Sequence, residues 1–341
     1  MTRVMQVMSG AERGGAETYF VNLVLALHRA GVSQQVAIRR NAERAAILRA
    51  GGVDPAELRF GRRFDFFTTP RLRRLAAEFR PEVVVSWMSR AAAMLPRGDY
   101  VHIGRLGGYY DLKSFRGCDH LVCNTQDLVR HCIDGGFAAD RVHYLPNFVS
   151  FTPRPAQSRA DLDTPADVPL LLAMGRLHPV KAFDILIRAL AAVPGAYLWL
   201  AGEGAEGDSL QALAAQLGVA DRVRFLGWRN DREALYAAAD LCIVPSRSEP
   251  FGNVILDAWT AGIPLVAAAA LGPAAYVINE ENGLLVPIDD ADALALAVNR
   301  LIGDPALRQR LVDGGRATWS AEFTETKVVG RWRDLFTTVT A

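Results

Sequence analysis

Short apolar runs alternate with longer amphipathic segments along the chain. The short runs are rich in β-branched residues and favour strands, whereas the longer segments have apolar positions at helical spacing. This alternation is typical of βα units, which build parallel sheets. In the first half it predicts strands at residues 4–8, 36–38, 83–87, 100–103, 121–123 and 142–145, and a helix over residues 18–29.

The alternation is interrupted once, near the middle of the chain. Residues 151–169 contain Pro153, Pro155, Pro165 and Pro169, and proline at that density breaks both helix and strand, so we predict a linker there. Beyond it the alternation restarts. It predicts strands at residues 170–174, 197–201, 223–226, 241–244, 264–268 and 284–286, and helices at about 181–193, 208–217, 231–239, 253–261 and 291–302.

A chain of 341 residues is long enough for two domains, at about 100–200 residues per domain. We predict an α/β protein with two doubly wound, Rossmann-like domains over residues 1–150 and 170–320. Two such domains facing each other would leave a cleft suited to a substrate. The C-terminal residues 321–341 contain a further predicted helix at 325–339, which could pack back on the N-terminal domain.

Composition and charge sharpen this picture. Half of the residues are hydrophobic and 22% are charged, which excludes a disordered chain and a coiled coil. The net charge of +1 conceals a balance of +7 over residues 1–150 (21 basic, 14 acidic) and of −6 over 151–341 (17 basic, 23 acidic). Such asymmetry concerns partners rather than fold. We see no signal segment and no apolar run of about 18 residues, which predicts a soluble protein of a reducing, cytoplasmic compartment.

Two glycine-containing turns follow predicted strands. Gly14 and Gly15 could bring the backbone close to a ligand, with the next helix N-terminus favouring an anion, although a plain tight turn is the alternative. Gly175 and Arg176 follow the first strand of the second half, and Lys181 comes five residues after Arg176. These two cations could clamp a diphosphate, because an exposed basic pair at a helix start would otherwise oppose the helix dipole.

The richest stretch is PSRSEPFGNVILDAW at residues 245–259. Glu249 lies in its loop, where a carboxylate can reach sugar hydroxyls, and residues 251–254 offer the N–H groups of a first helical turn to a phosphate. Asp257 lies one turn beyond Asn253 and shares its face of the helix. The two carboxylates could be structural, but a loop leading into a helix favours a ligand site.

Two other patterns have a plainer interpretation. Gly202, Gly204 and Gly207 match the dinucleotide fingerprint G-x-G-x-x-G, but Asp221, the acidic residue at the required distance, precedes the next strand instead of ending it. We therefore expect a loop lining the cleft and not a dehydrogenase. The cysteines and histidines between residues 118 and 132 lack the spacing of a zinc site, so no metal site is predicted.

Arginines and phenylalanines are interleaved from Arg59 to Arg80. Such a segment suits an anionic membrane surface. However, Leu72, Leu75 and Phe79 share one helical face, so the arginines could be only the solvated side of a core helix.

Taken together, these motifs resemble those of the retaining GT-B glycosyltransferases of family 4, often described as glycosyl transferases group 1. The resemblance covers essentially the whole chain. It rests on GGAE at residues 14–17, VHYLPNFV at 142–149, GRL and a lysine within 175–181, and the acidic pair Glu249 and Asp257. The resemblance implies a GT-B fold and the transfer of a sugar from a nucleotide-diphosphate donor with retention at the anomeric carbon.

The resemblance also implies roles for individual residues. Arg176 and Lys181 would hold the diphosphate and offset charge on the leaving group, and Glu249 would contact the sugar. Asp257 would bind the ribose. The two cations and a helix end would replace a metal, so no cofactor is expected beside the donor, a UDP-, GDP- or ADP-sugar. The implied donor-binding residues are Gly14, Gly15, Gly175, Gly202, Arg229 (backbone, near the base), Phe251, Gly252, Asn253, Val254 and Asp257.

The sequence departs from the family pattern at three places. Asp257 stands where glutamate is usual, and Ala182 stands where glycine is usual after the lysine. The family often has His-Gly after the strand predicted at 100–103; here the stretch reads VHIGRLGG, so His102 or Arg105 could take that position as a base or an acceptor contact. No catalytic base is assigned. Front-side displacement, in which the leaving phosphate takes the acceptor's proton, needs none.

The function implied is a retaining glycosyltransferase that acts on a glycan or lipid-linked acceptor in lipopolysaccharide or other cell-envelope polysaccharide synthesis. It would be cytoplasmic, with peripheral contact to the inner face of the membrane through the region from Arg59 to Arg80, and without a nucleic-acid partner. The alternatives are a GT-B epimerase or phosphorylase and a non-catalytic sugar-nucleotide-binding protein.

Overall fold

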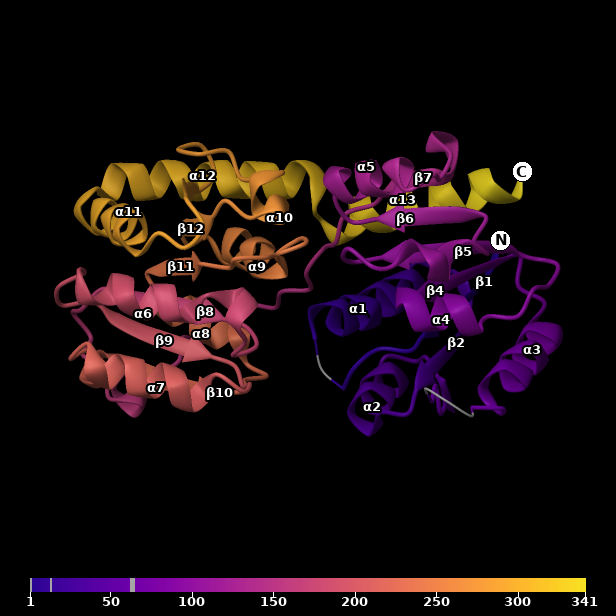
Figure 1. Cartoon of the computed structure of the whole chain (residues 1–341), viewed down its shortest axis with the longest axis horizontal. Helices are drawn as coiled ribbons and strands as arrows, with labels where there is room; N and C mark the ends of the chain where they lie inside the picture. Colours follow the sequence, from indigo (N-terminus) through magenta and orange to yellow (C-terminus); the bar gives the residue numbers. More distant parts are fainter. Residues whose placement is uncertain (1, 13, 62–64) are drawn as a thin grey trace. The chain divides into compact units, whose positions relative to one another are not determined.

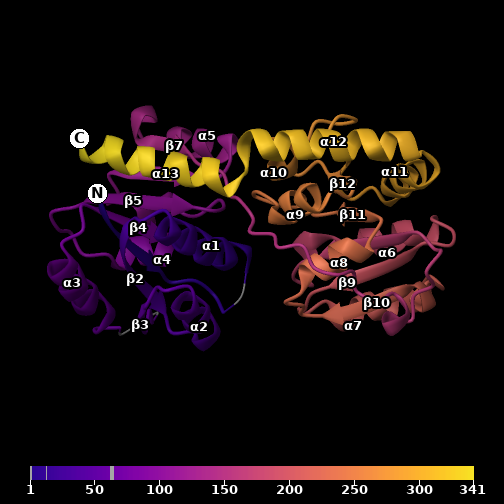
Figure 2. The same cartoon turned by 180° about the vertical axis from the view of Figure 1, so that it is seen from behind.

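The chain folds into two compact α/β units. The computed structural model describes residues 2–12, 14–61 and 65–341. One unit is formed by Met1–Val149 together with Phe323–Ala341, and the other by Ser150–Glu322. Each is a parallel sheet covered by helices, as Figures 1 and 2 show. The prediction of two doubly wound, Rossmann-like domains is therefore confirmed.

The first unit is built on a sheet with the order β3-β2-β1-β4-β5-β6-β7. Its inner strand β1 pairs in parallel with both β2 and β4, so that Gln6 lies opposite Val36 on one side and Val85 on the other. The strands are β1 (Arg3–Met8), β2 (Ser33–Arg39), β3 (Ala56–Leu58), β4 (Val83–Trp87), β5 (Val101–Leu106), β6 (His120–Cys123) and β7 (Val142–Tyr144).

Helices bury both faces of this sheet, which explains why its central strands are almost wholly apolar. One face packs against α1 (Gly15–Arg29), α2 (Ala42–Ala50) and α13 (Glu325–Thr340). The other packs against α3 (Thr68–Phe79) and α4 (Met88–Met94), while α5 (Gln126–Asp134) covers β6. Short 3₁₀ turns lie at Leu112–Phe115 and Ala139–Arg141.

The last helix, α13, belongs to the core of the first unit. Trp332 is fully buried and stacks on Trp87 at the end of β4, with ring centroids 6.4 Å apart and planes inclined by 22°. At the start of the helix, Glu325 pairs with Arg29 of α1 at 2.5 Å. The C-terminal residues therefore form a helix that covers one face of the first sheet, whose strand β1 lies near the N-terminus.

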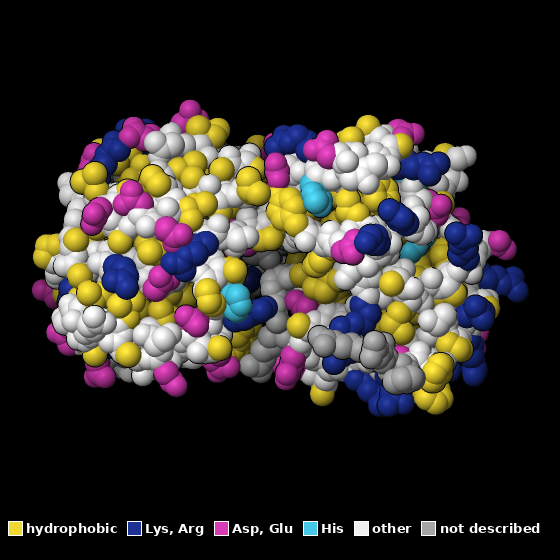
Figure 3. Space-filling view, in the orientation of Figure 1, with side chains coloured by type: hydrophobic (Ala, Val, Ile, Leu, Met, Phe, Trp, Pro, Cys, Tyr) yellow, Lys and Arg dark blue, Asp and Glu magenta, His cyan; other side chains and the backbone are white. Residues whose placement is uncertain are grey.

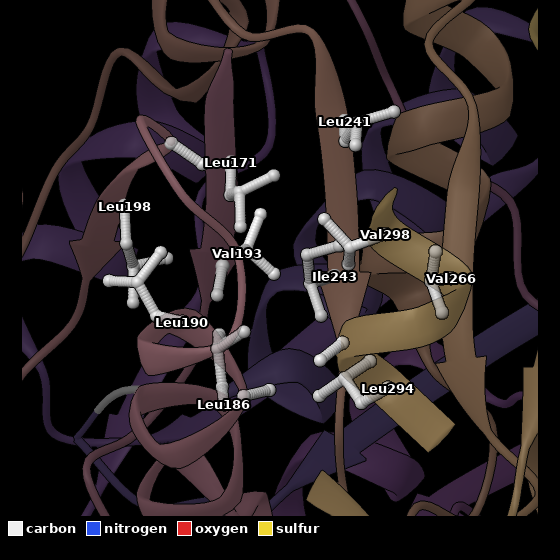
Figure 4. Close-up of a cluster of buried hydrophobic side chains, with 14 of the residues drawn as sticks. Leu171, Leu186, Leu190, Val193, Leu198, Leu241, Ile243, Val266, Leu294 and Val298 are labelled. Atoms are coloured by element: carbon white, nitrogen blue, oxygen red, sulfur yellow. The ribbon is translucent and has the colours of Figure 1, made fainter. Parts of the chain in front are cut away.

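The second unit repeats the architecture with the strand order β10-β9-β8-β11-β12-β13. Figure 4 shows its core, in which β8, β9 and β11 pack against α6 and α11 through buried Leu, Ile and Val side chains. The strands are β8 (Leu170–Met174), β9 (Tyr197–Ala201), β10 (Val223–Gly227), β11 (Leu241–Val244), β12 (Leu265–Ala268) and β13 (Leu284–Val286). The helices are α6 (Phe183–Ala191), α7 (Gly207–Gln216), α8 (Arg232–Ala238), α9 (Asn253–Ala261), α10 (Leu271–Ala274), α11 (Ala291–Gly303) and α12 (Pro305–Glu322), with 3₁₀ turns at Ala160–Leu162, Pro179–Lys181 and Ala220–Arg222.

The proline-rich segment predicted as a linker lies on the second unit. Arg159 donates to the carbonyl of Ala238 and pairs with Asp240 at 3.0 Å, and the Trp199 indole N–H donates to Thr164 Oγ1 at 2.9 Å. Apart from the 3₁₀ turn at Ala160–Leu162 the segment forms no helix or strand, and it is anchored on the unit through its side chains.

Candidate active site

The predicted diphosphate-binding residues gather at one edge of the second sheet. β8 lies between β9 and β11. The strands that follow β8 in the sequence are therefore added first on one side of it (β9, β10) and then on the other (β11, β12, β13), which makes β8 the point where the strand order reverses. In open parallel sheets, ligands bind outside the carboxyl ends of the strands at such a switch point. The loops after β8 and β11 carry Arg176, Lys181 and Glu249.

Glycines allow the loops after β8 and β9 to touch. Gly175 and Gly202 have φ angles of 154° and 149°, and a Cβ on Gly202 would lie 1.8 Å from the carbonyl oxygen of Gly175. A Cβ on Gly204 would meet the carbonyl of Leu177 at 2.2 Å, and Leu177 N–H donates to Glu203 O at 2.9 Å. The G-x-G-x-x-G match is thus explained by close packing of two loops.

Lys181 and Glu249 form an ion pair across this edge, although they are 68 residues apart. Their side chains are 23% and 13% exposed. Arg176, by contrast, is exposed and takes part in no ion pair among the described residues. Lys181, one of the two cations predicted to bind the diphosphate, is therefore paired with Glu249, whereas the second cation, Arg176, is exposed to solvent.

Lys181 does not begin a helix, contrary to the predicted helix over 181–193. It ends a 3₁₀ turn at Pro179–Lys181, and α6 begins at Phe183. Between them, Ala182 is buried with φ of 53°, a left-handed conformation that glycine adopts with less strain. The left-handed backbone at residue 182 thus explains why glycine is usual at this position in the family that the sequence resembles.

The N-terminus of α9 has no side-chain cap among the described residues. Gly252 precedes it with φ of 94°. Phe251 is 3% exposed and packs on Tyr276, so it can offer a phosphate only its backbone. Asn253 and Val254 form the first turn, where the backbone N–H groups of a helix end and the helix dipole favour an anion.

Asp257 lies deeper than its predicted ribose role suggests. It is 4% exposed, burial raises the pKa of its carboxyl to about 6, and Oδ1 has no hydrogen-bond partner among the described residues. Arg232, at the start of α8, lies 3.5 Å from that oxygen and donates to the carbonyl of Ser150 at 2.5 Å. The shorter acidic side chain therefore faces a partly exposed arginine, whose side chain is 22% exposed.

Sequence reasoning missed Arg232. A basic residue in the first turn of a helix opposes the helix dipole unless an anion lies nearby, and this signal was present in the sequence. Arg229, whose backbone is predicted to lie near the base, has its guanidinium engaged by both carboxylate oxygens of Asp231 and by Gln157, which leaves its backbone for that contact.

Gly14 and Gly15 lie in the first unit, at the start of α1. The Glu17 side chain folds back over this turn, where Oε1 accepts the N–H of Ala11 at 2.7 Å, and it is 6% exposed. A Cβ on Gly14 would lie 2.4 Å from Glu17 Oε2. Glycine at this position leaves the space that the end of the Glu17 side chain occupies, so GGAE forms a compact turn within its own unit.

The strand predicted at 100–103 spans Val101–Leu106, so that Arg105, expected after the strand, lies within it together with His102. His102 lies within β5, 8% exposed, with Nε2 2.8 Å from Ser86 Oγ. Burial lowers the pKa of His102 to about 4. A buried neutral imidazole inside a sheet has no access to an acceptor hydroxyl, so we assign it no catalytic role.

Arg105 lies farther along β5 and is 2% exposed. Its guanidinium lies 5.0 and 4.9 Å from the ring centres of Tyr19 and Trp87 and donates to Asn147 Oδ1 at 2.5 Å. Burial lowers its pKa. Arg105 thus ties the end of β5 to the PNF segment at residues 146–148.

His102 should make stability depend on pH. Its folded pKa, about 4, lies below the usual 6.5, so the stabilisation is complete above pH 6.5 and is lost as the pH falls towards 4. We expect the wild type to lose about 1.4 kcal/mol of unfolding free energy from this group by pH 5.5. Urea unfolding of the wild type and of His102→Gln across this range measures it; parallel pH curves would contradict it.

The described residues include neither a group of metal ligands nor a helix that could cross a membrane. Among residues 2–12, 14–61 and 65–341, no three His, Cys, Asp or Glu side chains are grouped so as to hold a metal ion. In the same residues, no helix is both long and apolar enough to cross a bilayer.

Comparison with known proteins identifies the family of the chain. The family model described as "Glycosyl transferases group 1" matches residues 156–318, and that of "Glycosyltransferase Family 4" matches residues 13–152. The lipopolysaccharide core biosynthesis glycosyltransferases LpsE and LpsD of Rhizobium meliloti (strain 1021) are each 38% identical to the chain. The LpsE match covers 94% of this chain and 95% of LpsE, and the LpsD match covers 98% of both.

A solved structure shares the whole fold. Anabaena Alr3699/HepE in complex with UDP-glucose superposes with a TM-score of 0.87 at 20% identity, over 99% of this chain and all of that one. Together with the two parallel sheets, this likeness confirms the predicted GT-B fold.

Proposed function

The chain belongs to family 4 of the glycosyltransferases, and on that premise we propose that it is a retaining, metal-independent enzyme of lipopolysaccharide core synthesis. The observation that carries the proposal is the ion pair of Lys181 with Glu249 beside the N-terminus of α9, which no side chain of the described residues caps. It brings the predicted diphosphate cation and the predicted sugar-binding carboxylate into contact, with a site for anions next to them.

Donor binding is proposed to exchange the partners of this pair. A nucleoside diphosphate brings two phosphates to Arg176, Lys181 and the first turn of α9. Lys181 then leaves Glu249 for the diphosphate, and the carboxylate becomes available to accept hydrogen bonds from sugar hydroxyls. Arg176, exposed and outside any ion pair of the described residues, supplies the second cation.

The same groups support the chemistry of transfer. The acceptor oxygen forms a bond to the anomeric carbon as the bond from that carbon to the phosphate oxygen breaks on the same face. The acceptor's proton passes to the leaving phosphate, so no protein base is needed. Arg176, Lys181 and the α9 dipole stabilise the negative charge that develops on the leaving group, which is the task that a metal would otherwise perform.

The proposed acceptor is a lipopolysaccharide core oligosaccharide. The support is that LpsE and LpsD, which are described as lipopolysaccharide core biosynthesis enzymes, match the chain over nearly its full length at 38% identity. The test is incubation with UDP-, GDP- and ADP-sugars and a deacylated core oligosaccharide, with the product followed by mass and anomeric proton coupling.

We expect acceptor-dependent transfer from one donor, with the anomeric configuration retained. Inverted product would contradict the retaining mode. Turnover of donor without acceptor, or dependence on inorganic phosphate, would favour an epimerase or a phosphorylase, and binding without any turnover would favour a binding protein.

We also propose that the first unit contacts an anionic membrane. Phe66 and Phe67, just before α3, are 73% and 65% exposed, and the guanidinium of Arg59 lies 5.6 Å from the Phe67 ring centre. Leu72 of α3 is buried in the core, so the helix itself is not available for insertion. Arg62, Arg63 and Phe64 of the predicted region lie outside the described residues.

Charge supports this membrane surface, defined here as Arg59, Phe66, Phe67, Arg71 and Arg73. Its three arginines are exposed, and Figure 3 shows many Lys and Arg side chains among hydrophobic ones on one face of the first unit. Exposed rings flanked by cations suit the headgroup region of anionic lipid.

Replacing both rings should weaken membrane contact. We expect Phe66→Ser with Phe67→Ser to reduce co-sedimentation with vesicles of 30% anionic lipid by about tenfold or more, because each ring loses about 1.5–3 kcal/mol of apolar burial. The control is Leu296→Ser on α11, 72% exposed in the second unit. Equal sedimentation of the double variant and the wild type would refute the surface.

A further inference from the structure

Arg247 connects several segments at the carboxyl ends of the strands of the second unit. It lies in the loop after β11, two residues before Glu249. Its Nη1 and Nη2 atoms donate to Oδ1 and Oδ2 of Asp184, in the first turn of α6, at 2.9 and 2.7 Å. Its Nε pairs at 2.5 Å with Asp289, which lies in the loop after β13. The guanidinium therefore joins the loops after β11 and β13 to the start of α6.

The same residue holds the 3₁₀ turn that ends at Lys181. Arg247 N–H donates to the carbonyl of Val180 at 2.9 Å, and its Nη1 also donates to the carbonyl of Pro179 at 2.7 Å. Both residues of the turn that precede Lys181 are thus bonded to the loop that carries Glu249. These hydrogen bonds set the backbone position of Lys181 relative to that loop.

The charge of Arg247 is taken up by the protein's own carboxylates. Hydrogen bonding to Asp184 raises the pKa of Arg247. Burial acts against ionisation of Asp184, but its hydrogen bonds with Arg247 and the charge of that residue lower the pKa of the carboxyl. With Asp289 the cluster contains one cation and two carboxylates, so it offers a diphosphate no net positive charge. A planar guanidinium can engage a carboxylate through two parallel bonds, which the ammonium of a lysine cannot do.

We propose that Arg247 is a positioning residue for Lys181: it fixes the turn that carries the lysine at the place from which its ammonium reaches both Glu249 and an arriving diphosphate. The inference rests on the proposed function, in which Lys181 exchanges these partners. Exposed ion pairs contribute little on their own, but a bidentate arginine within a network is the exception. Because a small displacement of a ligand-binding group is costly, the loss of Arg247 should be felt at a diphosphate that Arg247 does not touch.

A double-mutant cycle on nucleotide affinity tests this role. Arg247→Met removes every guanidinium contact and keeps an unbranched side chain. For the tightest-binding of UDP, GDP and ADP, measured by calorimetric titration, we expect this substitution to raise the Kd by about 5- to 30-fold when Lys181 is present, within the range of coupling between neighbouring residues. In the Lys181→Ala background it should change the Kd by less than about twofold, because the group that Arg247 positions is absent.

Two further variants guard against an indirect effect. Arg300→Met removes the arginine of the exposed pair with Glu280 in the same unit and should leave the Kd unchanged. If Arg247→Met does not fold, Asp184→Asn takes its place in the cycle, because it weakens the same bidentate contact from the side of α6; it should raise the Kd only when Lys181 is present. A general loss of stability lowers the Tm in both backgrounds but does not make the change in Kd depend on Lys181.

The outcomes separate this inference from the function on which it rests. A rise in Kd that depends on Lys181, with Arg300→Met unchanged, is the expected result. An equal rise with and without Lys181, or no rise in either background, would overturn the positioning role and leave the transferase intact. A wild type that binds none of the three nucleotides, or a Lys181→Ala variant that binds as the wild type does, would instead overturn the proposed donor site itself.

Discussion

Lys181→Ala is expected to weaken binding of the donor's nucleoside diphosphate by about 10- to 100-fold. A charge-assisted hydrogen bond to phosphate is worth about 1.5–3 kcal/mol, and the substitution removes it. The substitution also leaves Glu249, only 13% exposed, without its cation beside an arriving diphosphate, and this repulsion acts in the same direction. Calorimetric titration of the two proteins with the nucleotide measures the difference.

The chain supplies a matched control for this experiment. It contains only three lysines, and Lys113 is an exposed one in the first unit. Lys113→Ala should bind nucleotide as the wild type does. If Lys181→Ala also binds with unchanged affinity, Lys181 does not contact the diphosphate and the exchange of partners is wrong.

Glu249→Gln is expected to separate binding from transfer. The glutamine is neutral, so Lys181 is no longer held by an ion pair and the affinity for a free nucleoside diphosphate should be equal or higher. Transfer should fall by about 10- to 150-fold, because charge-assisted hydrogen bonds to the sugar hydroxyls are lost. Titration with the diphosphate and initial rates of transfer give the two quantities.

An exposed ion pair of the same unit provides the comparison. Glu280 and Arg300 pair at 2.5 Å with side chains about half exposed, and surface pairs of this kind contribute little. Glu280→Gln should therefore change neither quantity. A Glu249→Gln variant that transfers sugar at the wild-type rate would remove Glu249 from the reaction, and one that loses diphosphate affinity would contradict its competition for Lys181.

The layered fold was predictable, and the failures have identifiable physical causes. Strands buried on both faces give strong apolar runs, so the central strands of both sheets follow from the sequence. β3 is a three-residue edge strand and was missed. The 18-residue helix α12 was missed because Gly314 and Gly315 interrupt its apolar pattern; their missing side chains admit the Glu281 carbonyl and the Trp259 ring, 2.0 and 2.3 Å from a Cβ at each position.

The site was predictable as a set of residues, but not as an arrangement. Sequence motifs and the family resemblance named Arg176, Lys181, Glu249 and Asp257. The pairing of Lys181 with Glu249 joins loops 68 residues apart, and no local pattern encodes it. Asp257 and Arg232 likewise meet through the packing of two helices.

Thermal unfolding with nucleoside diphosphates tests the central claim most directly, that the second unit holds a donor diphosphate through Arg176, Lys181 and the α9 N-terminus. At about 100 times its Kd, a ligand specific to the folded state stabilises it by about 2.7 kcal/mol. We expect one of UDP, GDP and ADP to raise the Tm of the wild type, and the rise to shrink sharply in Lys181→Ala. No rise with any of them, or an equal rise in both proteins, would contradict the claim.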